Sequence, residues 1–238
     1  MQDYIAVLII SIAAAAAGVL LGCGAVYFFN RLPGQWLVDY GETPDEELLH
    51  PTTQRLKSTP WKFIFSGIFV VIGIYLGLDS PAYAVAVLAM LWLLILMAAA
   101  DIKYRIVPDQ LVLLLLVCGL GFIPFHGDGP LGGLWGALTG FGVMIAMGAA
   151  GKLIYRKETL GGGDIKLFGA LGLCTGFDGI LIVFVLTTLL SAAHLAYLLM
   201  RRRVKLTDQQ PMVPYIAVSA GIYVVLLHEI SYNIMIAF

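Results

Sequence analysis

Long apolar runs recur along almost the whole chain of 238 residues and constrain its fold more than any other feature. A helix needs about 20 predominantly apolar residues to cross the hydrocarbon core of a bilayer. Short polar or Gly/Pro-containing breaks separate eight such runs, at residues 4–29, 63–78, 82–100, 110–125, 131–150, 165–175, 178–200 and 213–236. We therefore predict an all-α polytopic membrane protein with about eight transmembrane helices.

The composition argues against a soluble domain. Hydrophobic residues make up 60% of the chain and charged residues only 12%, compared with roughly 25% charged residues in ordinary soluble domains. The 14 basic and 15 acidic residues leave no basic excess for a nucleic acid. We expect the lipid bilayer, and no nucleic acid, as a partner.

Cysteine usage indicates neither a disulfide scaffold nor a thiolate zinc site. Cys23, Cys118 and Cys174 all lie in apolar stretches, and no two of them form a CxxC pair. Such isolated cysteines are typical of packing residues. No pair of histidines has the spacing of metal ligands, and for His194, inside an apolar run, we expect a hydrogen-bonded packing role.

The distribution of basic residues predicts how the chain is oriented. All 14 Lys and Arg residues lie in segments 30–62, 101–109, 151–166 and 201–212. Because bases in short loops stay on the cytoplasmic side, an eight-span path with both termini outside satisfies every loop. A single crossing by residues 165–200 would place Arg201–Arg203 outside, so we expect a turn within residues 175–179.

This path divides the chain into three parts. Residues 1–29 form a first transmembrane helix that is retained rather than cleaved, residues 30–62 form a small cytoplasmic cap or ordered linker, and residues 63–238 form a membrane-embedded core. Glycines four residues apart, at 18 and 22 and at 132, 136 and 140, predict close contacts between helices.

Two aspartates are attached directly to predicted membrane helices. Asp101 follows an unbroken apolar run, and Asp164 opens the short run after Gly161–Gly163. Ionisable groups at such depths usually face a protein interior or a wet cavity. The predicted topology places both acids on the cytoplasmic face, where two carboxyl groups can share a proton. One can then accept a proton from water while the other donates to a carbonyl, which is aspartic-protease chemistry.

Simpler roles remain open for each residue taken alone. Asp101 could reach the interface or pair with Lys103 or Arg105, and Asp164 could cap its helix after a flexible glycine turn. For Asp109, after Pro108, we expect an N-cap role that shapes the loop. Gly161–Gly163 could instead adopt positive φ and let a substrate backbone approach.

Four segments resemble one family. Residues 101–109 (DIKYRIVPD) resemble the D-x6-P-D segment of type IV prepilin peptidases, and residues 161–167 (GGGDIKL) resemble their GxGD segment. Asn30-Arg31-Leu32-Pro33 resembles the exit from the family's first span, although Asn and Arg are adjacent here. Pro211-Met212-Val213-Pro214-Tyr215 resembles the start of its last span.

The resemblance implies a GxGD-type intramembrane aspartyl protease of the plasma membrane. Such an enzyme removes the basic leader from type IV prepilins or pseudopilins at the cytoplasmic face, commonly cutting after a glycine that precedes the substrate's hydrophobic helix. The family's catalytic aspartates correspond to Asp101 and Asp164, and proteolysis is expected to need no metal or other cofactor. We assign substrate-binding or loop-shaping roles to the neighbouring residues Gly161, Gly162, Gly163, Pro108, Asp109, Lys103 and Lys166.

One departure from the family affects its second activity. Many members also methylate the new N-terminus with S-adenosylmethionine and carry paired CxxC zinc motifs in the first cytoplasmic loop. This chain has no cysteine between Asn30 and Lys62. S-adenosylmethionine is therefore expected as a cofactor only if the methyltransferase activity is retained. A proton- or cation-coupled transporter using the same acids, or a non-enzymatic scaffold, is the alternative function.

Overall fold

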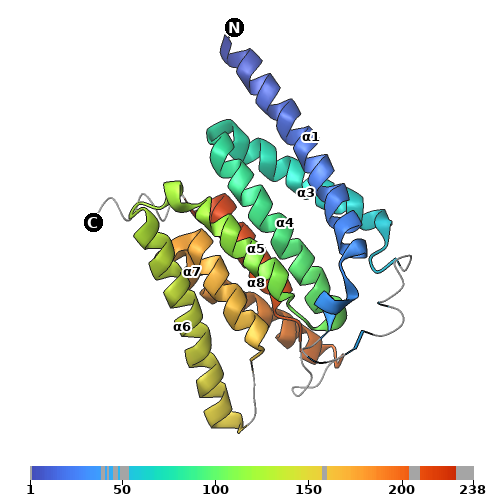
Figure 1. The fold of residues 1–238 in the computed structure, drawn as a ribbon, viewed down its shortest axis with the longest axis vertical. Helices are drawn as coiled ribbons and strands as arrows, with labels where there is room; N and C mark the ends of the chain where they lie inside the picture. Colours follow the sequence, from blue (N-terminus) through green and yellow to red (C-terminus); the bar gives the residue numbers. More distant parts are fainter. Residues whose placement is uncertain are drawn as a thin grey trace.

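The computed structural model describes residues 2–38, 41, 43–44, 48, 54–156, 160–203 and 210–228. All regular structure in these ranges is helical (Figure 1). In chain order the elements are α1 (Gln2–Arg31), the short η1 (Gly34–Leu37), α3 (Ser58–Asp79), α4 (Pro81–Tyr104), α5 (Asp109–Leu120), η2 (Ile123–Phe125), α6 (Pro130–Tyr155), α7 (Gly162–Met200), α8 (Val213–Ile222) and η3 (Tyr223–Leu227).

The predicted all-α membrane fold is confirmed. Within the part of the chain that the structure describes, five helices are long and apolar enough to span a bilayer, namely α1, α3, α4, α6 and α7. The apolar helices Asp109–Leu120 and Val213–Leu227 are shorter. The number of eight crossings, and the side of the membrane on which each end lies, stay predictions.

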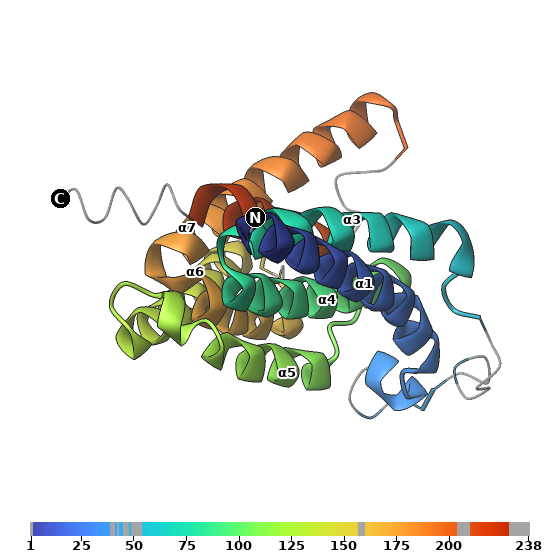
Figure 2. The same cartoon turned by 90° about the horizontal axis from the view of Figure 1, so that it is seen from above.

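The long helix α7 is interrupted where the sequence predicted a turn. Gly176 has φ 73° and ψ −178°, a conformation that breaks the helix and that residues with a side chain rarely adopt. The Nδ1 atom of His126 also lies 3.2 Å from the position that a Cβ at Gly176 would occupy. Beyond this break, the later part of α7 projects away from the other helices (Figure 2).

Glycines bring two helix pairs into close contact, as the spacing predicted. Gly18 and Gly22 of α1 pack directly on the backbone of α3 at Val70 and Ser66. In the same way, Gly136 of α6 packs directly on the backbone of α7 at Gly172. In each case a Cβ atom would overlap the partner helix. Because packing drives helix association in lipid, these glycines specify which helices are neighbours.

Helix α4 is the centre of the fold. It packs against α1, α3, α5 and α8, and Figure 1 shows it between α3 and α5. Ser80 begins the helix by accepting a hydrogen bond from the N–H of Tyr83 at 3.4 Å, and Pro81 occupies the first helical position. At the other end Arg105 has φ 60° and reverses the chain. This buried helix therefore holds Asp101, in its last turns, at a defined place.

Candidate active site

Asp101 connects the end of α4 to the beginning of α8. Its side chain is buried, and its Oδ2 atom accepts a hydrogen bond of 2.8 Å from the backbone N–H of Val213. The first N–H groups of a helix have no partner within the helix, and the residue before Val213 provides no side-chain cap. Asp101 therefore caps α8 from another helix.

Asp164 lies in the first turn of α7 and is half-buried. The N-cap position belongs to Gly161, which has φ −72° and ψ 139°. The N-cap role considered for Asp164 is thus wrong, and so is a positive φ at Gly161. The carboxyl group of Asp164 is left on the helix side that faces the cleft described below.

The three glycines before Asp164 differ in their surroundings. A Cβ at Gly163 would lie 2.8 Å from the Cβ of Val107, whereas nothing lies within 4 Å of the corresponding position at Gly162. At Gly161 the nearest neighbour is Oδ2 of Asp164, at 3.5 Å. Gly163 therefore permits α7 to begin against the segment that connects α4 and α5. Gly161 and Gly162 leave space on the side of Asp164.

Asp109 and Lys166 form an ion pair between α5 and α7. The Nζ atom of Lys166 donates to Oδ1 and Oδ2 of Asp109 at 2.9 and 2.8 Å. Pro108 is the N-cap of α5 and Asp109 its first residue, so the N-cap prediction for Asp109 is wrong. Both side chains are partly exposed, and such a pair stabilises the fold by at most about 1 kcal/mol. Its main effect is to align the starts of the two helices.

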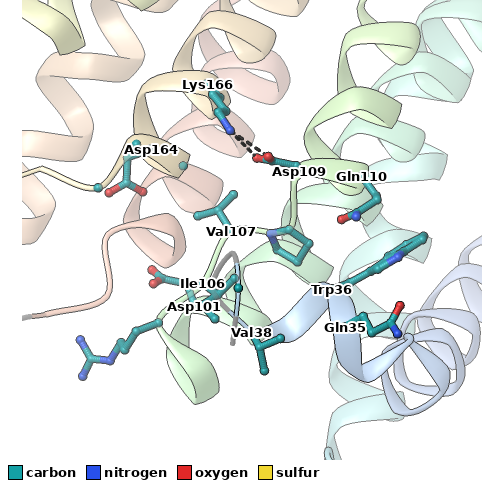
Figure 3. A pocket seen from close by; sticks show the side chains of 16 residues that line it. Gln35, Trp36, Val38, Asp101, Ile106, Val107, Asp109, Gln110, Asp164 and Lys166 are labelled. Carbon is teal, nitrogen blue, oxygen red and sulfur yellow. Dashed lines mark hydrogen bonds and ion pairs between the residues drawn. The ribbon is translucent and has the colours of Figure 1, made fainter. Parts of the chain in front are cut away.

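These residues surround one cleft, which has a volume of about 640 Å³ (Figure 3). Asp101 and Asp164 lie 63 positions apart in the sequence, yet both line it. The remaining lining residues are Gln35, Trp36, Val38, Gly41, Arg105, Ile106, Val107, Pro108, Asp109, Gln110, Gly161, Gly162, Gly163 and Lys166.

Among the residues assigned to substrate binding or loop shaping, Lys103 lies outside this lining. Its Nζ atom donates a hydrogen bond of 3.0 Å to the carbonyl oxygen of Arg55. This contact attaches α4 to the loop before α3, which fits loop shaping rather than substrate binding. Pro108, Asp109, Lys166 and the three glycines do line the cleft.

Sequence reasoning missed the wall that the segment after α1 contributes. Gln35, Trp36 and Val38 line the cleft from η1 and the residue after it. Two sets of hydrogen bonds hold the segment there. Asn30 exchanges two hydrogen bonds with the backbone of Leu56, at 2.7 and 3.0 Å. The Asn30–Pro33 resemblance was a signal of this wall, although it did not indicate where the segment would lie.

The second set of hydrogen bonds comes from the buried side chain of Arg55. Its guanidinium group donates to the carbonyl oxygen of Leu32, and to that of Leu48 at 3.1 Å. Two separate stretches of the loop are thereby attached to one side chain. That residues 30–62 form a small cytoplasmic cap or an ordered linker stays a prediction.

The three histidines in the described ranges lie away from the cleft. His126 bonds the carbonyl oxygen of Leu173 at 3.0 Å, and the ring of His228 packs 4.8 Å from that of Tyr83. His194 forms the expected hydrogen bond, with the hydroxyl of Tyr215, but its side chain is exposed rather than packed in the interior. Within the described ranges, no group of three or more His, Cys, Asp and Glu side chains could hold a metal ion. His50 lies outside the described residues.

Comparison with known proteins places the site within a family. Residues 88–196, which contain both Asp101 and Asp164, match the type IV leader peptidase family. The leader peptidase HopD of Escherichia coli is 32% identical over 126 residues, which cover 52% of this chain and 81% of HopD. The chain belongs to the type IV leader peptidase family.

Other members of the type IV leader peptidase family are longer than this chain. A prepilin leader peptidase/N-methyltransferase of Aeromonas salmonicida strain A449 is 36% identical over 138 residues, covering 58% of this chain and 47% of that protein. The protein of the same name from Aeromonas hydrophila is 35% identical over 138 residues, covering 58% and 48%. The chain thus spans about half the length of these curated relatives. No solved structure matches it.

Membership of this family and the five long apolar helices identify an integral membrane protein. The cleft lies where the long apolar helices α4 and α7 and the shorter α5 begin or end. Both acids therefore occupy helix ends within the region shared with the family.

Proposed function

We propose that this protein is an intramembrane aspartyl endopeptidase that removes the basic leader from type IV prepilins or pseudopilins. The observation that carries the proposal is the meeting of Asp101 and Asp164 in one cleft, although they come from different membrane helices. The names of the relatives, which are leader peptidases and prepilin leader peptidases, support the reaction class.

In the proposed reaction the two carboxyl groups share one proton and use it in turn. The ionised group takes a proton from water as the water oxygen attacks the scissile carbonyl carbon, and the protonated group donates to the carbonyl oxygen. The tetrahedral intermediate then collapses as the C–N bond breaks. The leaving amine takes the proton that the first carboxyl group accepted from water, and the intermediate's hydroxyl returns its proton to the second carboxyl group. The Val213 N–H holds the Asp101 side chain in place at 2.8 Å.

The setting of the cleft supports cleavage near a membrane surface. Arg105, Lys166 and Lys103 lie on the elements that surround it, in segments that the distribution of basic residues assigns to the cytoplasm. We propose that both termini lie outside and that the cut is made at the cytoplasmic face of the plasma membrane. A basic leader would be attracted there by anionic lipid headgroups.

Proteolysis is proposed to proceed without a metal or another cofactor. Methylation of the mature N-terminus is a separate question. The Aeromonas proteins are named as both peptidase and N-methyltransferase, whereas HopD is named as a leader peptidase alone. S-adenosylmethionine would serve this chain only if that second activity is retained. The transporter alternative is not supported, since the relatives found are leader peptidases.

Cleavage of a test prepilin by the purified protein, in detergent or liposomes, tests the proposal. The substrate carries a basic leader that ends in glycine and an apolar helix after it. Conversion to a shorter product that Asp101→Asn and Asp164→Asn each abolish, with mass spectrometry placing the cut after glycine, is the expected result. Cleavage that persists in either folded variant would contradict the catalytic role of the Asp101–Asp164 pair. If the folded protein cleaves none of several prepilins, a non-enzymatic scaffold is favoured.

The same samples report on methylation. With S-adenosylmethionine present, a product heavier by one methyl group shows that the second activity is retained. An unchanged mass, beside complete cleavage, shows a peptidase alone.

A further inference from the structure

A second, apolar groove adjoins the cleft. It has a volume of about 420 Å³ and lies between α5, α6 and α7. Its walls are made by α5 and α6 side chains, and the small residues Ala137, Gly169 and Ala170 leave the space between them. The other lining residues are Asp109, Val112, Leu113, Leu116, Leu134, Leu138, Phe141 and Lys166.

The groove and the cleft share the ion pair of Asp109 and Lys166. Both residues line both cavities, so the groove begins where the cleft ends. From Asp109 to Leu116 the α5 wall covers eight residues, and the seven steps of 1.5 Å between them amount to about 10 Å, or two helical turns. The groove therefore leads from the two catalytic candidates into the apolar layer of the helix bundle.

Its lining is apolar except at this junction. Leu113, Leu134 and Leu138 are each more than half exposed, so a bound segment would meet side chains that are not covered by the protein itself. A ligand that fits has to be apolar along about two helical turns and polar where it passes the ion pair. A polypeptide with a scissile bond in the cleft and an apolar helix beside that bond has this arrangement.

We propose that the groove holds the first turns of the substrate's apolar helix while the adjoining peptide bond lies between Asp101 and Asp164. This inference rests on the proposed function and adds to it a binding surface for the part of the substrate that is retained after cleavage. In lipid, where apolar surroundings offer no hydrophobic gain, the helix would be held by packing against these walls.

Filling the groove tests the inference. Ala137→Leu places a larger side chain among the lining residues, and Ala146→Leu makes the same change at an exposed position of α6 outside the lining. Two substrates are compared: a full-length test prepilin, and a peptide with its leader and only the residues around the cleavage site. We expect Ala137→Leu to raise KM for the prepilin at least about tenfold, which corresponds to about 1.4 kcal/mol, with kcat unchanged. Cleavage of the short peptide, and both activities of Ala146→Leu, should match the unaltered protein.

The outcomes separate this inference from the proposed function. An equal loss of cleavage activity with both substrates overturns the groove assignment. So does unchanged activity with both substrates, which is the result expected if lipid chains alone fill the groove. Absence of cleavage by the unaltered protein counts against the proposed function instead.

Photocrosslinking provides a measurement that does not depend on turnover. A photoreactive phenylalanine derivative at Leu138, which lines the groove, should crosslink the prepilin's apolar helix in an Asp164→Asn protein. The same group at Trp135, an exposed α6 residue outside the lining, should not. Equal crosslinking at both positions, or crosslinking at Leu138 to lipid only, would contradict the inference.

Discussion

The carboxylate of Asp101 accepts a hydrogen bond of 2.8 Å from the backbone N–H of Val213, although 112 positions separate the two residues. One end of the proposed catalytic pair is thereby attached to the start of α8. The segment Pro211–Tyr215 thus has a structural reason to resemble the family, because it supplies the N–H group that holds Asp101. Asp101 therefore makes two contributions that can be measured separately, one to catalysis and one to the stability of the fold.

Substitutions of Asp101 should separate these two contributions. In Asp101→Asn the side-chain oxygen can still accept from Val213, so we expect little change in thermal unfolding but a loss of cleavage of at least about 100-fold, since general acid–base catalysis contributes 10²–10⁴-fold. Asp101→Ala should in addition destabilise the protein by about 1–3 kcal/mol, because the N–H is left unpaired. Thermal unfolding in detergent and a cleavage assay measure the two effects. Equal stability of Asn and Ala variants would show that the hydrogen bond contributes little.

The pH dependence of cleavage should be bell-shaped. The proposed reaction needs one carboxyl group protonated and the other ionised. Activity is therefore lost at low pH, where both are protonated, and at high pH, where both are ionised. Initial rates measured across the pH range, with unfolding followed at each pH, check this. A flat profile over the neutral range would argue against two coupled carboxyl groups.

Exchanging the charges of the Asp109–Lys166 ion pair should restore the cleavage activity that substitution of either residue alone reduces. Asp109→Asn and Lys166→Met each remove a partly exposed pair worth at most about 1 kcal/mol, so we expect cleavage to fall by no more than about fivefold. The double variant Asp109→Lys with Lys166→Asp should recover much of the activity if alignment of α5 and α7 is the role of the pair. A 100-fold loss in Asp109→Asn alone would instead place Asp109 in the chemistry.

Arg55 should hold the wall formed by Gln35, Trp36 and Val38. Replacing it by Met leaves the carbonyl oxygens of Leu32 and Leu48 without their donor, and hydrogen bonds to charged groups contribute about 1.5–3 kcal/mol each. We expect Arg55→Met to lower the unfolding temperature and to raise KM more than it lowers kcat. Arg55→Lys should restore part of the loss, and Lys57→Met, at an exposed neighbouring position, should have no effect. An unaltered KM in Arg55→Met would show that this wall does not contact the substrate.

Chelators should leave proteolysis unchanged. The proposed reaction activates water with two carboxyl groups and needs no metal ion. Cleavage rates before and after treatment with EDTA or a zinc-selective chelator provide the measurement. Inhibition that added zinc reverses would contradict the metal-free mechanism.

Features that depend on neighbouring residues in the sequence were predicted well. The apolar runs determined the helices, because in lipid a segment of that length and composition is stable as a helix. The break in α7 at Gly176 falls within the predicted turn of residues 175–179, since glycine tolerates the backbone conformation found there. Asp101 and Asp164 were placed at helix ends for the same local reason.

Contacts between distant residues were decided by the tertiary structure. Asp109 follows a proline at a helix start, which locally predicts a cap, yet Lys166 of another helix is its partner. Similarly, Trp36 reaches the cleft because Asn30 and Arg55 fold the loop back on itself. By itself, the sequence determined which segments become apolar helices and which acids lie near their ends. Only the packing of those helices decided which side chains share a cleft, because a side chain's partner depends on the relative positions of whole elements rather than on its neighbours in the chain.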